Sequence, residues 1–580
     1  MVERGCRVPD LASQLVSRCN GDGIGDLPGI TSKLDYIKAL GVDVIWLSPV
    51  YASPLKDYGY DISDFKAINP LYGTLEDWDT LQRGCAERGM KIMMDLVLNH
   101  TSDQHPWFLS AKSSKDSPFR DFYYWRDPRP ESEGGPEPNN WKSVFGGSAW
   151  QWSEETGQYY LHQYAVEQPD CQWENPKVRE AFYDIVRFWL ERGCSGFRLD
   201  ACSRLSKVEG LPDAEVVDPN QRYQNCNKLV KHGPRLCDYF RELYDQALKD
   251  YDLITVGEMS DTSPEMAMRY INPDDPQLQM IFQFDYWALD SDNGNPLKYR
   301  RCPLPELKDC LNRWQTELDE RGGWNSIVTS NHDQGRVVSK WGNDSPEWRT
   351  RSAQLLAILQ ATQPGTLYLY QGEELAMKNV PEDYRIEDLL DVQTINYWKE
   401  IKTARAAGSS EAEPDMSDIM RDLRIKARDN GRLPVPWDAR QPHAGFTNCQ
   451  QGPWMVANKD DSAYAAAQQE GDLDSVLSFW KRAIALRKAH NEYFIYGTFH
   501  LLDRDHPEVF AYTVAKTTGT DQVKAPSVVV LNFSESVTEW SLPANVEIGH
   551  VLLSNYTDGP ERRDGRLILQ GWQGVVYNAK

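Results

Sequence analysis

The most informative stretch of the chain is Gly196-Phe197-Arg198-Leu199-Asp200, a short apolar strand that ends in a carboxylate. Side chains alternate along a strand, so Arg198 and Asp200 should share one side while Phe197 and Leu199 point to the other. A neighbouring cation favours an ionised carboxylate, so we expect Arg198 to lower the pKa of Asp200, as a nucleophile or an electrostatic stabiliser requires. A structural ion pair at a strand end would give the same pattern. Only repetition of the pattern along the chain distinguishes a catalytic carboxylate from a structural ion pair.

The same pattern recurs at other short apolar runs that stop at polar residues. Strands are predicted at residues 44–47, 91–98, 253–258, 280–284, 326–329 and 366–370. Segments with a helical period lie between them, and the clearest begins at Asn175 and Pro176, which are typical of a helix N-terminus, and stops at Gly193. Strands that alternate with helices predict a (β/α)8 TIM barrel with its chemistry at the C-terminal ends of the strands. The polar strand ends should therefore converge on one site.

An eighth strand is needed to close the barrel, and it should precede the helix expected at residues 31–40. Residues 8–16 stand there, but Pro9 and Asp10 make this segment a poor strand. Two readings stay open. Either the neighbouring strands force a weak segment into place, or this N-terminus is not the one with which the fold was built.

Three further segments depart from the barrel pattern. Residues 101–172 lack the alternation of strands and helices and are rich in proline, glycine and tryptophan, which predicts an inserted subdomain over the site. Residues 378–475 read as a loop-rich, acidic segment. Short strands separated by turns predict a C-terminal antiparallel β-sandwich at residues 497–580. The barrel itself is then assigned to residues 1–100 and 173–496.

Composition narrows the classes of partner. The chain has 580 residues, with 63 Lys and Arg against 86 Asp and Glu, and its formal net charge is -23. Such an acidic surface repels nucleic acids and anionic membranes and suits a neutral or cationic partner. The first residues lack the apolar core of a signal peptide, and no run is long and apolar enough to span a membrane, so we expect a cytoplasmic protein. Eleven cysteines without CxxC spacing indicate reduced thiols.

Three acids at predicted strand ends, Asp200, Glu258 and Asp333, require a joint explanation. Two carboxyl groups are enough to cleave a glycosidic bond, because one attacks or stabilises the anomeric carbon while the other donates a proton to the leaving oxygen. The same acids, together with His100 and His332, could instead bind a divalent metal ion at the barrel mouth. The residue types alone leave both readings open.

Seven motifs follow one another along the chain. They are Asn20-Gly21-Asp22-Gly23-Ile24-Gly25-Asp26-Leu27, Asp95-Leu96-Val97-Leu98-Asn99-His100-Thr101-Ser102, Gln168-Pro169-Asp170, Gly196-Phe197-Arg198-Leu199-Asp200, Val256-Gly257-Glu258, Ser330-Asn331-His332-Asp333-Gln334 and Gln371-Gly372-Glu373-Glu374. Together they resemble the α-amylase superfamily of glycoside hydrolases, and within it the branch of oligo-1,6-glucosidases and maltases. The resemblance runs from about residue 20 to the end of the chain.

This resemblance implies a retaining α-glucosidase. It gives Asp200 the role of nucleophile, Glu258 that of general acid and then base, and Asp333 that of holding the distorted sugar ring by its hydroxyls. It argues against the metal reading, because the catalytic acids of this family bind sugar. Charge-assisted hydrogen bonds to the glucose in the cleavage subsite are expected from His100, Arg198 and His332.

The resemblance also predicts how the substrate is selected. Asp61 and Arg432 look like the pair that grips the non-reducing terminal glucose, which would limit the enzyme to releasing single glucose units. Ala201 follows the nucleophile, where members that act on α-1,6 links carry Val and those that act on α-1,4 links carry Ala or Thr. We therefore expect a monomeric enzyme that acts on small oligosaccharides and favours maltose over isomaltose.

Two alternatives to a maltase stay open. One is an oligo-1,6-glucosidase, or isomaltase, on the same fold. The other is a catalytically impaired barrel with a scaffold role, like the transporter-associated heavy chains that resemble this family. Those chains carry a membrane segment and have lost catalytic acids, whereas this sequence keeps all three acids.

A turn dense in oxygen-bearing residues precedes the first helix. Asn20, Asp22, Ile24 and Asp26 stand at its alternate positions and look like part of a calcium loop. Asn-Gly and Asp-Gly are also ordinary turn sequences. We expect at most one structural calcium ion and no other cofactor.

Overall fold

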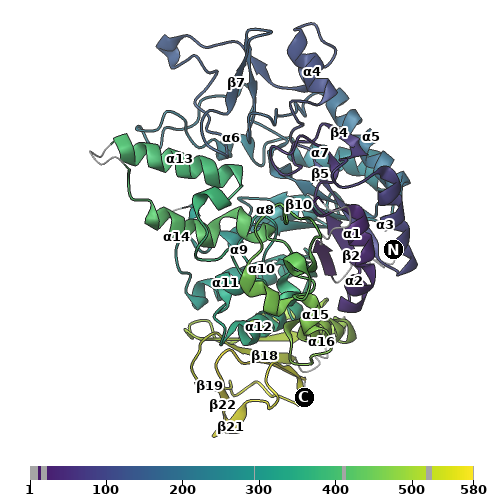
Figure 1. The fold of residues 1–580 in the computed structure, drawn as a ribbon, viewed down its shortest axis with the longest axis vertical. Helices are drawn as coiled ribbons and strands as arrows, with labels where there is room; N and C mark the ends of the chain where they lie inside the picture. Colours follow the sequence, from purple (N-terminus) through teal and green to yellow (C-terminus); the bar gives the residue numbers. More distant parts are fainter. Residues whose placement is uncertain (1–10, 15–21, 293, 408–412, 517–525, 579–580) are drawn as a thin grey trace.

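Eight parallel strands form the centre of the molecule in the computed structural model, which describes residues 11–14, 22–292, 294–407, 413–516 and 526–578. Their order in the sheet is β11-β10-β9-β5-β2-β1-β15-β14. The two outer strands of this order also meet, since Ser326 Oγ of β14 donates to Ile281 O of β11. The sheet therefore closes on itself, and the predicted TIM barrel is confirmed (Figure 1). The strands are β1 (Leu11–Gln14), β2 (Val44–Leu47), β5 (Lys91–Val97), β9 (Gly196–Asp200), β10 (Ile254–Met259), β11 (Met280–Gln283), β14 (Ser326–Val328) and β15 (Thr366–Tyr370).

The weak N-terminal segment supplies the eighth strand. The backbone of β1 pairs with β15, where Leu11 lies opposite Leu367, and with β2, where Ala12 lies opposite Val44. Neighbours on both sides thus hold a segment that is a poor strand by itself. Pro9 lies outside the described residues.

Helices surround the barrel and connect its strands. The longest of the early ones, α5, begins where the sequence predicts, with the Asn175 side chain accepting from Lys177 N. Its apolar face, including Val178, Phe182 and Trp189, is buried against the barrel. The helices that pack around the barrel are α1 (Leu27–Ser32), α2 (Leu34–Leu40), α3 (Leu75–Glu87), α5 (Pro176–Glu191), α7 (Leu236–Leu243), α8 (Pro264–Ile271), α9 (Asp285–Ala288), α10 (Leu304–Glu320), α11 (Val337–Trp341), α12 (Arg349–Ala361), α15 (Ala466–Gln469), α16 (Val476–Ala489) and α17 (Asn491–Phe494).

An inserted lobe covers one end of the barrel, as predicted for residues 101–172. It contains α4 (Pro106–Ser113), a three-stranded sheet of β6 (Trp125–Arg126), β8 (Gln158–Leu161) and β7 (Trp150–Ser153), and α6 (Asn227–Val230). Its core joins Trp141 and Trp150 to Leu211 and Val230. The lobe is thus larger than predicted, because the segment after β9, which the sequence assigns to the barrel, packs on it.

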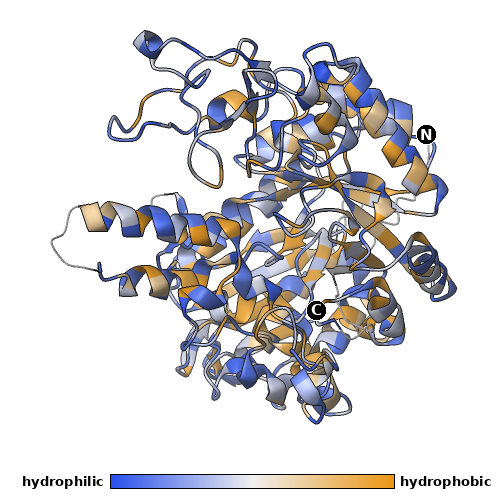
Figure 2. Cartoon of the chain, turned by 45° about the horizontal axis from the view of Figure 1, so that its top comes forward, coloured by the Kyte–Doolittle hydropathy of each residue, from blue (hydrophilic) through white to orange (hydrophobic). Residues whose placement is uncertain are grey.

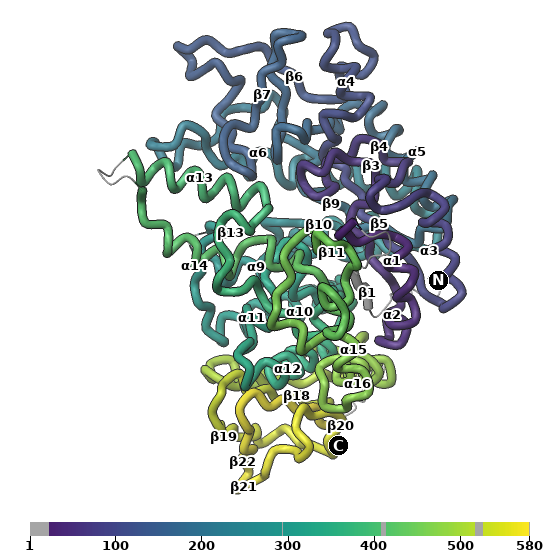
Figure 3. The backbone as a smooth tube through the Cα atoms, viewed as in Figure 1, coloured from purple at the N-terminus to yellow at the C-terminus, as the bar shows by residue number. Residues whose placement is uncertain are grey.

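Two helices project from the barrel beside this lobe. They are α13 (Val392–Ala407) and α14 (Ser417–Lys426), which run side by side in Figures 1 and 3. The sequence presents this region as loop-rich. Most side chains of α13 stay partly exposed, and its hydropathy is mixed along its length (Figure 2). The missing apolar stripe explains why periodicity did not reveal it.

The structure also contains two small antiparallel sheets of two strands each. One pairs β3 (Tyr51–Ala52) with β4 (Asp64–Ile68), and the other pairs β12 (Ser291–Asp292) with β13 (Asn295–Tyr299).

The C-terminal part forms the predicted antiparallel sandwich. One sheet has the order β16-β17-β18-β23-β20 and the other the order β19-β22-β21. Valines of the first sheet, including Val528 and Val530, pack on Trp540 and Leu567 of the second. The strands are β16 (Thr498–Leu501), β17 (Val509–Ala515), β18 (Ser527–Asn532), β19 (Thr538–Ser541), β20 (Val551–Ser554), β21 (Glu561–Arg563), β22 (Arg566–Leu569) and β23 (Gly574–Tyr577).

Helix length and hydropathy show whether a helix could span a membrane. Among the described residues, no helix combines the length and the apolar character that crossing a bilayer requires.

Candidate active site

The three predicted acids meet at one cavity of about 750 Å³. Asp200 ends β9, Glu258 lies near the end of the adjacent β10, and Asp333 follows β14. The ends of β9 and β10 lie under the inserted lobe, near the middle of the molecule (Figure 3). Parallel strands present their C-terminal ends on one face, so residues far apart in the chain come together there.

Arg198 is the cation that joins the acids. Its Nη1 lies 2.6 Å from Asp200 Oδ1 and 2.9 Å from Asp95 Oδ1, and its Nη2 lies 2.7 Å from Glu258 Oε1. Asp95 is the direct neighbour of Arg198 in the register of β5 and β9. Since the guanidinium is planar and rigid, it fixes Asp200 and Glu258 at neighbouring nitrogens.

Burial is the largest influence on the pKa of Asp200. It raises the pKa of Asp200 well above its usual range, Glu258 and Asp95 add to the shift, and Arg198 only partly opposes it. The expected lowering of the pKa of Asp200 is therefore wrong, because burial outweighs the effect of Arg198, a guanidinium that also pairs with Asp95 and Glu258. Burial likewise raises the pKa of Asp95 to about 6.

Asp333 has the opposite environment. Its Oδ1 lies 2.7 Å from Arg428 Nε and 2.9 Å from Arg432 Nη2. Burial alone would raise the pKa of Asp333, but Arg428, His332 and Arg432 outweigh burial and hold the pKa well below its usual range. Asp333 is therefore ionised at physiological pH.

The two predicted histidines occupy different positions. His100 lines the cavity, and its Nε2 lies 3.1 Å from both Tyr60 O and Gln168 Nε2. His332 stands behind the cavity wall with its Nε2 2.8 Å from Tyr60 Oη, and burial lowers its pKa to about 3. Arg198 is also absent from the cavity lining. Sugar contacts by Arg198 and His332 stay predictions.

Asp61 and Arg432, which the sequence predicts to grip the terminal glucose, each bind other groups of the protein. The carboxylate of Asp61 accepts hydrogen bonds from Ser53 Oγ and from the backbone N–H groups of Lys56 and Asp57, so it holds its own loop together. Arg432 instead donates to His332 O and pairs with Asp333. Neither Asp61 nor Arg432 lines the cavity.

A different acid and arginine stand at the cavity in their place. Arg428 Nη2 lies 3.4 Å from Asp57 Oδ1, and Gln168 Nε2 donates to Asp57 Oδ2 at 3.1 Å. Both Asp57 and Arg428 line the cavity. Each lies four residues before the residue that the sequence suggested, and glucose contacts by Asp61 and Arg432 stay predictions.

Residues 14–497 match the family model described as alpha amylase, catalytic domain. The chain belongs to the α-amylase family. It is a glycoside hydrolase, since curated members of this family match it over nearly its whole length.

Relatives in the α-amylase family carry several specificities. The chain is 44% identical to an alpha-glucosidase of Schizosaccharomyces pombe over 93% of this chain and 91% of the relative. It is 43% identical to an oligo-1,6-glucosidase of Bacillus cereus over 97% and 96% of the two chains. The structure of isomaltulose synthase from Klebsiella sp. LX3 superposes with a TM-score of 0.91 at 36% identity, covering 100% of both chains.

Ala201 lines the cavity of this α-amylase family member in a strained conformation. Its φ is 46° and its ψ is 25°, in the left-handed region that residues with a side chain rarely adopt. Its backbone N–H donates to Glu258 Oε2 at 3.0 Å. The strained turn therefore aims an N–H at the neighbouring acid, as strained residues at functional sites often do.

The turn before α1 carries the calcium prediction. Asn20 lies outside the described residues. Asp22 Oδ1 accepts from Ile24 N, and Asp26 Oδ1 accepts from Gly29 N and so caps α1. Within the described ranges, no three His, Cys, Asp or Glu residues gather in a way that could hold a metal ion. One oxygen of each aspartate serves the turn itself, and calcium binding stays a prediction.

Proposed function

We propose that this glycoside hydrolase is a retaining, exo-acting α-glucosidase that releases glucose from the non-reducing end of short α-glucosides and favours maltose. The proposal rests on one observation: the Arg198 guanidinium forms ion pairs with both Asp200 and Glu258 at the cavity wall. Retaining glycosidases need two carboxyl groups about 5 to 5.5 Å apart. Binding to adjacent nitrogens of one planar group keeps two acids close in this way.

Each acid then has a distinct task. Asp200 in its ionised form, which pairs with Arg198, attacks the anomeric carbon and forms a covalent glycosyl intermediate. As the glycosidic bond breaks, Glu258 gives its proton to the leaving oxygen. Glu258 next takes a proton from water, which releases glucose with its α configuration retained. The ionised Asp333, held by Arg428 and Arg432, accepts hydrogen bonds from sugar hydroxyls that strengthen as the ring distorts.

The exo action rests on Asp57 and Arg428. Gln168 donates a hydrogen bond to Asp57 and so helps to fix its position. The Asp57 carboxylate offers acceptors and the Arg428 guanidinium offers donors to the hydroxyls of a terminal glucose. A sugar that continued past this pair would have to separate the two charges inside a buried wall, which is costly. We therefore infer that the pair admits only a chain end.

The preference for maltose rests on Ala201. A methyl group next to the nucleophile leaves room for the leaving sugar of an α-1,4 link, whereas valine would narrow this space. Relatives named alpha-glucosidase and oligo-1,6-glucosidase both match the chain closely, so isomaltase specificity is the alternative. Ala201→Val is expected to shift the ratio of kcat/KM values toward isomaltose, and a wild-type enzyme that prefers isomaltose would contradict the maltase assignment.

The experiment measures glucose release from maltose and isomaltose by wild type, Asp200→Asn and Glu258→Gln. Both substitutions should lower kcat at least about 1000-fold, or ~4 kcal/mol. Asp252→Asn, which changes an exposed carboxylate next to β10, is the matched control and should behave as wild type. Proton NMR should detect α-glucose first. An inactive but folded wild type would favour the scaffold alternative, and β-glucose as first product would exclude retention.

Three further expectations belong to this proposal. A monomer is tested by light scattering, and a cytoplasmic location by cell fractionation. A structural calcium ion near Asp22 and Asp26 is tested by whether a chelator lowers the Tm.

A further inference from the structure

A buried carboxylate behind the cavity wall, that of Asp391, has no part in the chemistry of the three acids. It is fully buried, it does not line the main cavity, and it directly precedes α13. Its Oδ1 lies 3.4 Å from Arg428 Nη1 and 3.4 Å from Arg432 Nη1. Asp391 therefore contacts the same two arginines that hold Asp333.

The carboxylate and the backbone of Asp391 are both fixed. Its Oδ2 accepts from Thr394 N at 3.1 Å and from Thr394 Oγ1 at 3.3 Å, as the side chain of an N-cap residue does. Its backbone N–H donates to Asp429 Oδ1 at 3.2 Å. Asp391 can therefore hold other groups in place, because its own position is set by the start of the helix and by the turn that carries the arginines.

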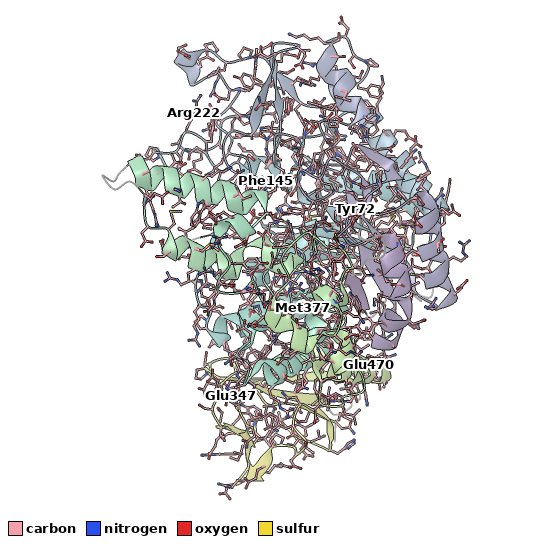
Figure 4. The ribbon with its side chains drawn as sticks, viewed as in Figure 1. Tyr72, Phe145, Arg222, Glu347, Met377 and Glu470 are labelled. Atoms are coloured by element: carbon pink, nitrogen blue, oxygen red, sulfur yellow. The ribbon has the colours of Figure 1, made fainter. Side chains whose placement is uncertain are left out.

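The inner end of α13 is held as well. Asn396 Nδ2 donates to Phe145 O at 3.1 Å, and Figure 4 shows Phe145 beside this end of the helix. The Arg428 guanidinium lies 5.6 Å from the centre of the Phe145 ring. These contacts oppose a shift of the helix that would move Asp391 away from the arginines.

Each arginine divides its nitrogens between two aspartates. Arg428 directs Nε to Asp333 Oδ1, at 2.7 Å, and Nη1 to Asp391. Arg432 directs Nη2 to Asp333 Oδ1, at 2.9 Å, and Nη1 to Asp391. A guanidinium is planar and its donors keep fixed directions. Binding of both Nη1 atoms by Asp391 therefore limits how far either arginine can turn toward Asp333.

The second oxygen of Asp333 shows the consequence. Both arginines bind Oδ1, whereas Oδ2 accepts no hydrogen bond from the part of the chain that the structure describes and lies 3.5 Å from His332 Nε2. Arginine pairs often bind both oxygens of a carboxylate, and here they bind one. Asp333 lines the cavity and its side chain is 30% exposed, so Oδ2 can accept from a sugar hydroxyl.

Arg428 has one carboxylate for each of its three nitrogens. Nε faces Asp333, Nη1 faces Asp391, and Nη2 faces Asp57 at 3.4 Å. Without the charge of Asp391, Nη1 would be buried beside a weaker partner, which is costly, and the guanidinium should turn toward the remaining carboxylates. Those are Asp57 and Asp333, the two that the substrate needs.

We propose that Asp391 is a positioning residue for the glycosidase reaction. It holds the Nη1 atoms of Arg428 and Arg432, so that both arginines bind Asp333 only through Oδ1 and leave Oδ2 for the sugar. The inference rests on the proposed α-glucosidase function, in which Asp333 holds the distorted sugar ring. Asp391 acts through the arginines, because it lies behind the cavity wall.

The kinetic test uses Asp391→Asn, which keeps the shape of the side chain and an oxygen for the helix start but removes the charge. Its kcat on maltose should fall about 20-fold while KM changes less than about twofold, because the contacts of Asp333 strengthen in the transition state. Asp391→Ser, whose hydroxyl also caps a helix, should show the same split.

Thr394→Val is the matched control, because it removes the hydroxyl that Asp391 accepts from and leaves the charge in place. It should lower the Tm and keep both kinetic constants of wild type. A structural role alone would give the same kinetics in Thr394→Val and Asp391→Asn. That result, or an unchanged kcat in Asp391→Asn, would overturn the inference.

A binding cycle separates this inference from the proposed function. Calorimetry with 1-deoxynojirimycin, a cationic glucose analogue, compares wild type, Asp391→Asn, Asp333→Asn and the double variant without turnover. Asp391→Asn should weaken binding about 10-fold, but it should add less than about twofold to the loss caused by Asp333→Asn, since it acts through that carboxylate. This result supports the inference even if wild type fails to hydrolyse maltose. Equal losses in both backgrounds, or no loss in Asp391→Asn, would overturn the inference even if maltose is hydrolysed as proposed.

Discussion

Two aspartates four residues apart, Asp57 and Asp61, have different surroundings at this site, and the contrast gives a prediction. Asp57→Asn should raise KM for maltose and lower kcat/KM about 100-fold with little change in Tm, because Asp57 faces the cavity and pairs with Arg428. Asp61→Asn should lower the Tm, because Asp61 is fully buried and accepts two backbone N–H groups of its loop. Steady-state kinetics and thermal unfolding of both variants measure the split. The assignment fails if Asp57→Asn leaves KM unchanged.

Site residues could be predicted from the sequence where a strand, or a motif just after a strand end, fixed the position. Asp200 and Glu258 stand on strands, whose alternation dictates which side chains share a face, and the structure brings them together. Asp57 and Arg428 stand in a loop and a short 3₁₀ turn, where no such period exists. The net pKa shift of Asp200 was also out of reach, because it depends on burial and on Asp95 and Glu258, which lie on other strands.

At the scale of elements, the end of β14 rests on a buried glutamate. Glu373 Oε1 accepts from Ser330 Oγ and from Thr329 Oγ1, and Gln360 Nε2 donates to its other oxygen. These contacts tie the loop after β15 to the segment that leads to Asp333. Burial raises the pKa of Glu373 to about 7.

This raised pKa predicts how stability depends on pH. The folded state holds the proton of Glu373 more tightly than the unfolded chain does, so the stabilising contribution is complete below about pH 4.5 and is lost as pH rises through about 7. Glu373→Gln cannot lose a proton, so its Tm should fall less than that of wild type between pH 5 and 8. Thermal unfolding across this range, with the exposed Glu347→Gln as control, checks the prediction. Parallel curves for wild type and Glu373→Gln would contradict it.

Elements were predictable from the sequence to the extent that their own periodicity forms them. The barrel strands and α5 follow from local patterns and end signals. By contrast, β1 is held by its neighbours β2 and β15, α13 lacks an apolar stripe, and the segment after β9 packs on the inserted lobe. These three features depend on contacts made across the chain, which a local pattern does not contain.

At the scale of the whole molecule, a buried lysine is one of the contacts that join the barrel to the C-terminal sandwich. Lys308 of α10 is fully buried, and its Nζ donates to three carbonyl oxygens, those of Asp503 at 2.8 Å, His506 at 2.7 Å and Val509 at 3.0 Å. An ammonium group has three N–H donors, and all three are used. The sandwich is thus joined to the barrel by a contact far from the catalytic acids.

Lys308→Met should therefore weaken the junction without altering the chemistry. The substitution leaves three carbonyl groups without their donor, and a buried unpaired polar group costs about 1–3 kcal/mol, so we expect a loss of ~3 kcal/mol or more. Proteolysis within residues 497–580 should become faster, while kcat at low temperature stays at the wild-type value because the active site lies at the other end of the barrel strands. Glu320→Gln, an exposed change on the same helix, is the control. An unchanged Tm would show that Lys308 does not hold the sandwich on the barrel, and a fall in kcat with unchanged Tm would mean that the sandwich acts on the active site.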